Sequence, residues 1–258
     1  SKLRVWLLHD CRPGHMSQLE GLARALEQET NAELLWFDAR KLSYKFRQLL
    51  SVKRHNESPH IIIAAGHSTH KALLLSARAH DAFSTVIMKP SLPIALFDAI
   101  ICPHHDGLAQ SGKTFNTQGS INKIVPSSDA IKEESQPRYR HLFVIGGPSK
   151  HFKWSDSVLV EQISYICQAA PEIHWTLSDS PRTPATFMSS LSELKLKNLT
   201  YHHYGDTGTP PLSTLLAESA FTWLSPDSMS MIYESLTAGS PTALLELEEN
   251  ANKANKRI

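Results

Sequence analysis

Short apolar runs alternate with helical patterns along most of this chain. In the first half, the segments 3–9, 33–37, 60–65, 84–88 and 99–102 have the length and content of buried parallel strands, and 17–29, 40–50 and 69–80 have helical spacing. In the second half, strands are expected at 141–145, 173–177, 198–202, 220–224 and 242–245, with helices at 155–169, 186–194, 211–218 and 228–238 and a charged helix at 246–258. This order predicts an α/β fold of two Rossmann-like domains with parallel sheets.

A polar stretch rich in Pro and Ser, residues 126–140, separates the two series. We therefore expect an N-terminal domain at 1–130, a linker at 131–140 and a C-terminal domain at 141–258 that is incomplete at its end. Neither half carries Gly-x-Gly-x-x-Gly, which argues against a dinucleotide redox site.

The composition excludes several classes of protein. The 258 residues carry a net charge of +1, so no general field attracts nucleic acid and an anionic ligand must be held locally. The three cysteines form no Cys-x-x-Cys pair, which is typical of a reducing compartment. The sequence shows neither a signal peptide nor a membrane span, and we expect a cytoplasmic protein, peripheral to the inner membrane at most. It carries no signal for an oligomeric state.

The first predicted strand runs into Asp10-Cys-Arg-Pro-Gly-His15, at the strand end where open α/β sheets bind ligands. An imidazole oriented by a carboxylate is a general base near neutral pH, so His15 and Asp10 are candidate catalytic residues. The alternative is that both residues only start the following helix.

Three loops of the second domain also follow strands. The Gly146-Gly147-Pro-Ser149-Lys150 loop offers close backbone approach and polar donors, and Arg182 offers a guanidinium to a diphosphate. The segment from Ser225 to Pro241 predicts a loop and a helix capped near Ser228 and ended by Gly239. Glu234 lies nearly two turns along this helix, at a distance that suits a sugar hydroxyl. Each loop alone is explained equally well as an ordinary turn, but together the three loops are expected to lie at one edge of the sheet.

The 14 histidines raise the possibility of a metal site, but none has a strong zinc spacing. We therefore expect no catalytic metal. His105, in His104-His105-Asp106, follows a strand and is a candidate for the cleft between the domains.

These motifs resemble a known family. Asp10-Cys-Arg-Pro-Gly-His15 with Gln18 and Gly21-Leu22 is similar to its opening Asp-Gly-Arg-Pro-Gly-His-x-x-Gln-x-x-Gly-Leu. Gly146-Gly147-Pro148, Arg182-Thr183-Pro184 and Asp227-Ser-Met-Ser-Met-x-x-Glu234 match three further signatures. The family is that of the "elongated mitochondria" fission protein of plants, whose bacterial members are classed provisionally as glycosyltransferases. More remotely, the chain resembles the peptidoglycan lipid-II N-acetylglucosaminyltransferase, a GT-B enzyme.

The resemblance implies a GT-B-like fold, with the two sheets facing across a cleft, and a nucleoside-diphosphate sugar as donor substrate with no further cofactor. It implies a lipid-linked or lipopolysaccharide acceptor at the membrane surface, with acceptor-side residues Arg12, Gly14, Gln18 and His105. It implies a nucleotide and diphosphate site made by Gly146, Gly147, Ser149, Lys150, Arg182, Thr183, Asp227, Ser228, Met229, Ser230 and Glu234. Two departures stand out: Cys11 replaces a glycine, so a positive φ there would be strained, and the Arg182 loop is longer and carries one arginine instead of two.

The sequence thus favours a metal-independent, inverting glycosyltransferase. A non-catalytic adaptor of the mitochondrial-fission type and a GT-B epimerase remain as alternatives.

Overall fold

The structure is a computed structural model that describes residues 2–41, 58–125 and 140–250. These residues divide into two compact units, with the division between Lys123 and Ile124. The predicted boundaries at 130 and 141 stay a prediction, because the predicted linker, apart from Arg140, lies outside the described residues.

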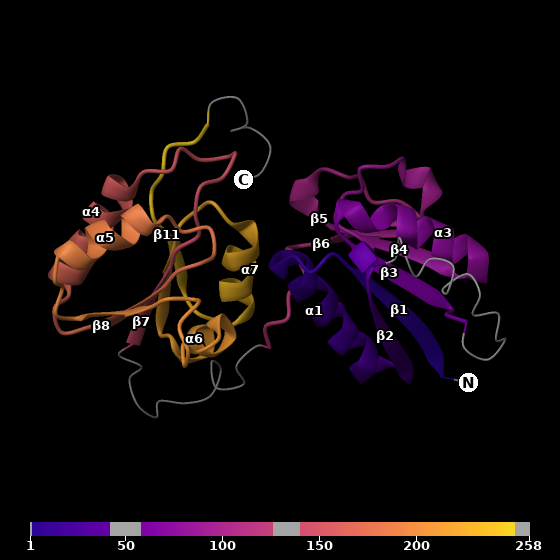
Figure 1. Cartoon of the computed structure of the whole chain (residues 1–258), viewed down its shortest axis with the longest axis horizontal. Helices are drawn as coiled ribbons and strands as arrows, with labels where there is room; N and C mark the ends of the chain where they lie inside the picture. The colour runs from indigo at the N-terminus through magenta and orange to yellow at the C-terminus, as the bar shows by residue number, and fades with distance from the viewer. Residues whose placement is uncertain (1, 42–57, 126–139, 251–258) are drawn as a thin grey trace. The chain divides into compact units, whose positions relative to one another are not determined.

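The described part of the N-terminal unit contains a parallel sheet with strand order β2-β1-β3-β4-β5-β6 (Figure 1). Its strands are β1 (Leu3–His9), β2 (Ala32–Asp38), β3 (Ile61–Ala65), β4 (Phe83–Ile87), β5 (Ala99–Pro103) and β6 (Thr114–Thr117), and its helices are α1 (Pro13–Glu29) and α3 (His70–His80). Short 3₁₀ turns η1 (Ala39–Lys41), η2 (His67–Thr69), η3 (Ile94–Leu96) and η4 (His104–Asp106) follow β2, β3, β4 and β5.

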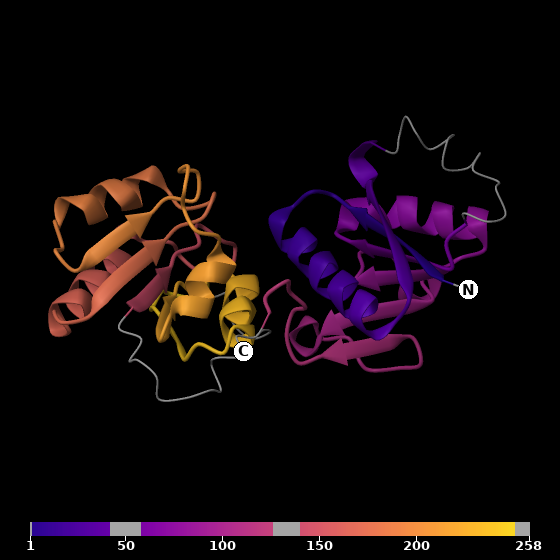
Figure 2. The same ribbon diagram turned by 90° about the horizontal axis from the view of Figure 1, so that it is seen from below.

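Alternating side chains of β1 build two cores, one on each face of this sheet. Val5 and Leu7 pack with Leu19 of α1, whereas Trp6 and Leu8 pack with Leu73 of α3. The helices therefore cover opposite faces, as Figure 2 shows. Burying one such aliphatic side chain stabilises the fold by about 1.5–3 kcal/mol, which explains why this almost wholly apolar strand lies inside the sheet, between β2 and β3, with both faces covered.

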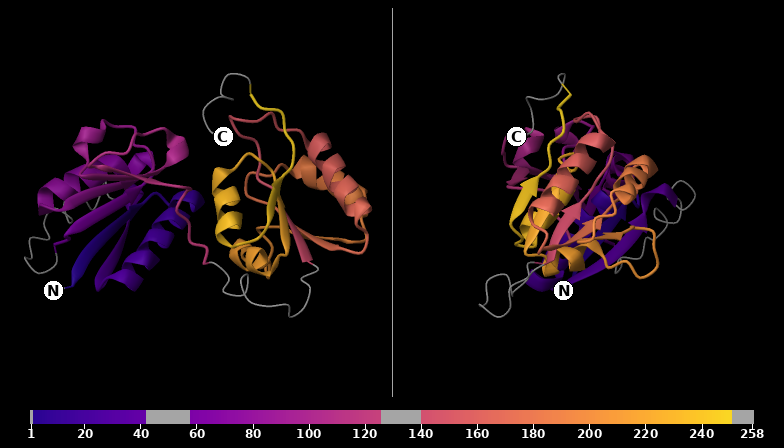
Figure 3. Two further views of the ribbon diagram at one scale, coloured as in Figure 1. Left: turned by 180° about the vertical axis from the view of Figure 1, so that it is seen from behind. Right: turned by 90° about the vertical axis from the view of Figure 1, so that its left-hand side faces the viewer.

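The described part of the C-terminal unit contains a second parallel sheet, with strand order β11-β10-β7-β8-β9. Its strands are β7 (Arg140–Val144), β8 (His174–Ser178), β9 (Leu199–His202), β10 (Phe221–Leu224) and β11 (Thr242–Leu244), and its helices are α4 (Asp156–Ala169), α5 (Ala185–Glu193), α6 (Leu212–Glu218) and α7 (Met229–Thr237). Phe143 faces α4 and α5, and Leu142 faces α6 and α7, so each face of the sheet carries two helices (Figures 1 and 3).

The predicted α/β class and the two Rossmann-like domains with parallel sheets are confirmed. Their facing arrangement across a cleft stays a prediction. Cys11 has a φ of 60°, so this position carries the positive φ that the sequence comparison identified as strained for a residue other than glycine. Two predictions for α7 are confirmed: Ser228 caps it, with its side chain accepting from the Met231 amide, and the helix ends before Gly239, whose φ is positive.

Two elements differ from the prediction. β6 was not predicted, because its four residues are polar apart from Phe115 and pair only with β5 at the sheet edge. The charged helix predicted at 246–258 is wrong for 246–250, where the chain is extended and Glu249 forms a β-bridge with Phe152; the rest lies outside the described residues. The helix predicted at 40–50 also lies outside them, apart from the end of η1.

Within the described segments, no helix combines the length and apolar character that crossing a bilayer requires.

Candidate functional site

Asp10 and His15 form a close pair at the carboxyl end of β1. His15 Nδ1 lies 2.9 Å from both carboxylate oxygens of Asp10, and Asp10 is only 6% exposed. Asp10 does not cap α1, whose N-cap is Arg12 with no side-chain cap hydrogen bond. The alternative explanation of the pair as helix-start residues is therefore not supported for Asp10.

Burial raises the pKa of Asp10, but hydrogen bonds from His15, the Arg12 amide and Ser68 outweigh it and hold that pKa below its ordinary value. An ionised carboxylate only accepts hydrogen bonds, so the proton of a neutral His15 ring resides on Nδ1. Nε2 is then left with its lone pair, which is the arrangement of a general base.

Two residues of the segment after β3 complete this pair and were missed from the sequence. Ser68 Oγ donates to Asp10 Oδ2 at 3.2 Å. Gly66 has φ of +97°, and a Cβ there would lie 2.5 Å from His15 Nδ1 and 2.6 Å from Asp10 Oδ2. Only glycine leaves room for the pair. The strand-end rule that selected Asp10 applies equally to Gly66-His-Ser68, which follows the neighbouring strand.

The other acceptor-side candidates fall into three situations. Arg12 is exposed, with its Nε 3.7 Å from Asp10 Oδ2. A Cβ on Gly14 would meet no atom within 4 Å, so packing does not require glycine there. Gln18 is 6% exposed, and among the described residues its buried Oε1 has no hydrogen-bond partner.

His105 lies away from this pair. It belongs to η4, after β5, and β3 and β4 stand between β5 and β1. At about 4.8 Å per strand, the two strand ends are ~14 Å apart. The structure therefore does not bring His105 to His15 within the sheet, although both follow strands at the same edge.

In the C-terminal unit, the three central strands β10, β7 and β8 are neighbours, so the loops that follow them converge at one edge. Asp227 joins these loops. Its Oδ1 accepts from Ser225 Oγ at 2.6 Å, and its Oδ2 accepts from the Gly147 amide at 3.0 Å and from Arg182 Nη2 at 2.8 Å. The Asp227 side chain is fully buried, whereas that of Arg182 is 45% exposed. The carboxylate of Asp227 thus lies in the interior, beneath the loops, and the guanidinium of Arg182 lies at the protein surface.

The two glycines of the β7 loop are fixed by close packing. A Cβ on Gly146 would lie 2.1 Å from Asp227 Oδ2, and one on Gly147 would lie 2.2 Å from the Arg182 carbonyl oxygen. The Gly146 amide donates to Ser225 Oγ at 2.8 Å. Both glycine N–H groups are therefore engaged inside the protein.

Thr183 has a similar internal role, because its Oγ1 donates to the Gly146 carbonyl at 2.5 Å. Ser180 Oγ donates to the same carbonyl at 2.8 Å. Ser149 Oγ accepts from the His151 amide at 3.2 Å. Lys150 is exposed, and its carbonyl accepts from Asn250 at 3.1 Å.

Helix α7 begins at the same edge. Ser228 is its N-cap, and Met229 and Ser230 lie in the first turn, whose N–H groups have no intrahelical acceptor. Ser230 and Glu234 are four residues apart and both half-buried, so they share one face, about 6 Å apart along the axis.

A second carboxylate–histidine pair at this edge was also missed. Asp179 directly follows β8, and its Oδ2 accepts from Tyr201 Oη at 2.5 Å and from His203 Nδ1 at 2.7 Å. Its Oδ1 accepts from the Tyr204 amide at 2.7 Å. Burial and this carboxylate raise the pKa of Tyr201 well above its usual range. Asp179 and His203 each follow a strand, a signal that the sequence offered.

The family is decided by residues 13–258, which match the family model described as mitochondrial fission ELM1. The chain belongs to this family. The predicted family is thereby confirmed. A curated relative, an uncharacterized protein of Rickettsia prowazekii (strain Madrid E), is 25% identical and covers 93% of this chain and 82% of its own.

Solved structures of UDP-sugar enzymes share the fold of this ELM1-family chain. MnaA of S. aureus with UDP has a TM-score of 0.61 and 14% identity and covers 96% of this chain and 80% of its own. The UDP-GlcNAc 2-epimerase of Neisseria meningitidis bound to UDP-GlcNAc has a TM-score of 0.58 and 12% identity. The match covers 97% of this chain and 85% of the epimerase chain. A UDP-glucosyltransferase of Polygonum tinctorium has a TM-score of 0.56 and 10% identity. The match covers 96% of this chain and 81% of the glucosyltransferase chain.

These similarities confirm the GT-B-like fold. A structure of MurG from Acinetobacter baumannii also matches, but its TM-score of 0.47 is too low to carry an argument.

Proposed function

We propose that this protein is a GT-B glycosyltransferase that takes its sugar from a nucleoside diphosphate held by the C-terminal domain. The observation that carries the proposal is the convergence of three strand-end loops on Asp227, which orders Gly147 and Arg182 beside the start of α7. Such order at the ligand-binding edge of a UDP-sugar-enzyme fold supports a site for a charged ligand.

The diphosphate would lie at the first turn of α7 and against Arg182. The N–H groups of Met229 and Ser230 and the positive end of the helix dipole favour an anion. Within the described residues, Arg182 has N–H donors beyond those that contact Asp227 and the carbonyls of Gly147 and Pro148. Because both glycine amides are already engaged, we assign Gly146, Gly147, Thr183 and Asp227 to shaping the loops. Ser149 and Lys150 would lie at the rim of the site.

Glu234 would contact the ribose. It shares the Ser230 face of α7, so a phosphate at the helix start places a sugar hydroxyl one turn further along. A carboxylate accepts hydrogen bonds from two adjacent hydroxyls, which suits a ribose.

The N-terminal domain would activate the acceptor. The acceptor hydroxyl oxygen attacks the anomeric carbon, His15 Nε2 removes the hydroxyl proton, and the bond to the diphosphate breaks with its electron pair leaving on phosphate oxygen. Asp10 stabilises the imidazolium that forms, 2.9 Å away. A general base of this kind contributes roughly 10²–10⁴-fold to the rate.

Arg182 and the start of α7 would stabilise the leaving diphosphate, a role that fixed donors can fill without a metal. The reaction requires the two domain sites to meet when the domains close, and closure would exclude water. We propose inversion and a lipid-linked or lipopolysaccharide acceptor on family likeness. Arg12, Gly14 and Gln18 would lie near the acceptor, and His105 would line the same edge further out.

The test combines binding with product analysis. The protein is screened by thermal shift against UDP-, GDP-, ADP- and CMP-sugars, and the stabilising donor is then incubated with and without lipid-linked acceptors. A transferase gives a glycosylated acceptor and the free nucleotide. An isomerised nucleotide sugar formed without acceptor would indicate an epimerase, and no stabilisation by any nucleotide would favour an adaptor.

A further inference from the structure

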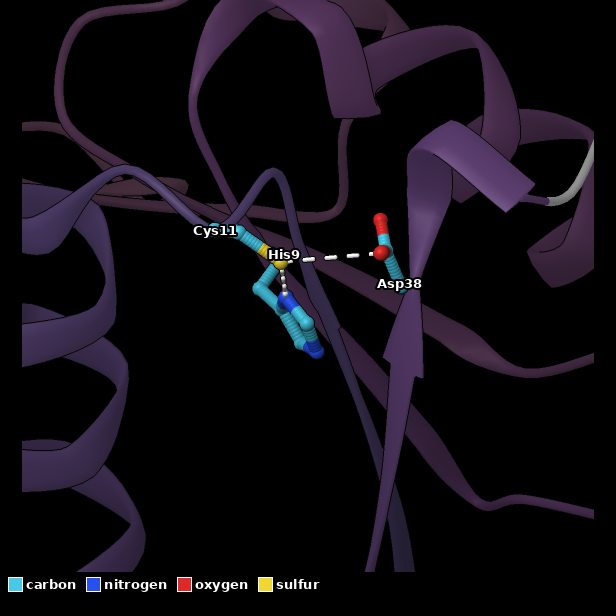
Figure 4. A group of neighbouring side chains, drawn as sticks. All are labelled: His9, Cys11 and Asp38. Carbon is cyan, nitrogen blue, oxygen red and sulfur yellow. Dashed lines mark hydrogen bonds between the residues drawn. The ribbon is translucent and has the colours of Figure 1, made fainter.

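His9, Cys11 and Asp38 form a cluster of potential metal ligands beside the Asp10–His15 pair. Cys11 Sγ lies 3.2 Å from His9 Nδ1 and 3.6 Å from Asp38 Oδ2. One ligand atom from each of the three residues lies within 4.8 Å of the other two. Figure 4 shows the sulfur between the imidazole and the carboxylate; His9 ends β1, Cys11 lies in the loop after it and Asp38 ends β2.

The fold brings Asp38 to His9 and Cys11, although Asp38 follows Cys11 by 27 positions in the sequence. His9 and Asp38 are direct neighbours in the parallel register of β1 and β2, so their side chains leave the sheet side by side. Asp10, between His9 and Cys11 in sequence, points instead to His15. No spacing within the sequence reveals a site whose ligands come from two strands.

The backbone at Cys11 places its sulfur here at a cost. Its φ of 60° lies in the left-handed region, which a residue with a Cβ adopts rarely. Glycine would adopt this φ without strain. The residue in the strained conformation is thus a cysteine, whose thiolate is a soft metal ligand.

The two distances from Cys11 Sγ suit a tetrahedral ion. Bonds of about 2.3 Å to sulfur and 2.0–2.2 Å to nitrogen and oxygen separate neighbouring ligand atoms by roughly 3.5 Å. Both contacts of Cys11 Sγ are close to this value. Cys11 is exposed, so the fourth position would face solvent and take water.

Arg40 is the competitor for this ion. Its Nε and Nη2 donate to the two oxygens of Asp38 at 3.0 and 2.9 Å, and Lys41 Nζ lies 3.9 Å from Asp38 Oδ2. The Arg40 side chain is 57% exposed, so it can move into solvent when a cation takes its place.

We propose that His9, Cys11 and Asp38 bind a divalent transition-metal ion, with Zn²⁺ the best match to one nitrogen, one sulfur and one oxygen ligand. The ion would replace Arg40 as the positively charged partner of Asp38. It would also hold in place the turn that carries Arg12 and leads into α1. The site stands on its own residues and does not depend on nucleotide binding by the C-terminal domain.

Cobalt substitution tests the proposal on the whole chain. Titration of the reduced protein with Co²⁺ should give a thiolate-to-cobalt charge-transfer band at one equivalent, and Zn²⁺ should displace it. Cys11→Gly should abolish the band while keeping the fold, because glycine suits this φ. Asp38→Asn should weaken Co²⁺ binding more than about tenfold, since even loss of an outer-shell partner costs roughly 10–100-fold.

Cys167→Ala is the matched control, because Cys167 is a buried free cysteine of the other domain. It should leave the band unchanged. A wild-type protein without a charge-transfer band, a band that survives Cys11→Gly, or Asp38→Asn binding as tightly as wild type would overturn the proposal.

Discussion

Arg182 Nη2 donates to Asp227 Oδ2 at 2.8 Å and joins the loops that follow β8 and β10. The carboxylate is buried and the guanidinium reaches the surface, so one contact connects the interior of the C-terminal domain to its proposed diphosphate site.

Asp227→Ala should lower the free energy of unfolding of the C-terminal domain by about 1–3 kcal/mol, because it leaves the Gly147 amide and the Ser225 hydroxyl without their buried acceptor. Urea unfolding measures this loss. Glu193→Ala, an exposed carboxylate at the end of α5, is the control and should change stability by less than about 0.5 kcal/mol. Equal stability of the two variants would contradict the role given to Asp227.

Two glycine substitutions should have opposite effects on stability. Gly147→Ala should destabilise by about 1–3 kcal/mol, because its Cβ meets the Arg182 backbone at 2.2 Å. Gly14→Ala should be neutral or stabilise α1 by up to about 1 kcal/mol, since its Cβ meets nothing. Thermal unfolding of both variants checks the contrast, and a destabilised Gly14→Ala would show a packing role for Gly14.

His15→Gln and Asp10→Asn should each reduce turnover by about 10²–10⁴-fold while donor affinity stays unchanged, because neither side chain belongs to the donor domain. Single-turnover assays and calorimetry separate the two effects. If His15→Gln keeps its turnover and Asp10→Asn loses it, Asp10 is the base instead.

Acid should destabilise the C-terminal domain through His141. Burial lowers the pKa of His141, whose ring lies 5.0 Å from that of Trp175. The unfolded chain therefore binds a proton at higher pH than the folded one. The contribution of neutral His141 to the free energy of unfolding is therefore fully present above about pH 6.5, the ordinary pKa of an unfolded histidine. It is lost as the pH falls from there toward the pKa of His141 in the folded protein.

His141→Phe removes this proton uptake and keeps an aromatic ring beside Trp175. Urea midpoints measured between about pH 7 and pH 5 should fall less in this variant than in wild type. His104→Gln, at an exposed position, should behave like wild type. If His141→Phe loses stability between about pH 7 and pH 5 as steeply as wild type, His141 is ruled out as a source of acid sensitivity.

The sequence predicted nearly every described helix and strand, because buried parallel strands are continuous apolar runs such as Val5–Leu8. It missed β6, since polar residues at a sheet edge give no such run. Residues 246–250 were read as helical from charge alone, whereas backbone pairing with the segment 151–153 keeps them extended.

The sequence indicated which strand-end loops contribute to the candidate sites, but it indicated a specific side-chain contact only where one loop holds both partners. Asp10 and His15 are five residues apart in a strand–turn–helix unit, and the sequence indicated them. Ser225 and Gly146 are 79 residues apart, and Asp179 and His203 are 24 apart. Pairing across separate strands depends on strand order, which local patterns do not encode.

Calorimetric titration of the protein with UDP, GDP, ADP and CMP tests most directly whether the C-terminal domain holds a nucleotide. One of them should bind with a dissociation constant between about 1 μM and 1 mM, the usual range for enzyme substrates. Glu234→Ala should weaken that binding about tenfold, and Glu193→Ala should not. No binding of any of the four, or equal affinity of wild type and Glu234→Ala, would contradict the proposed site.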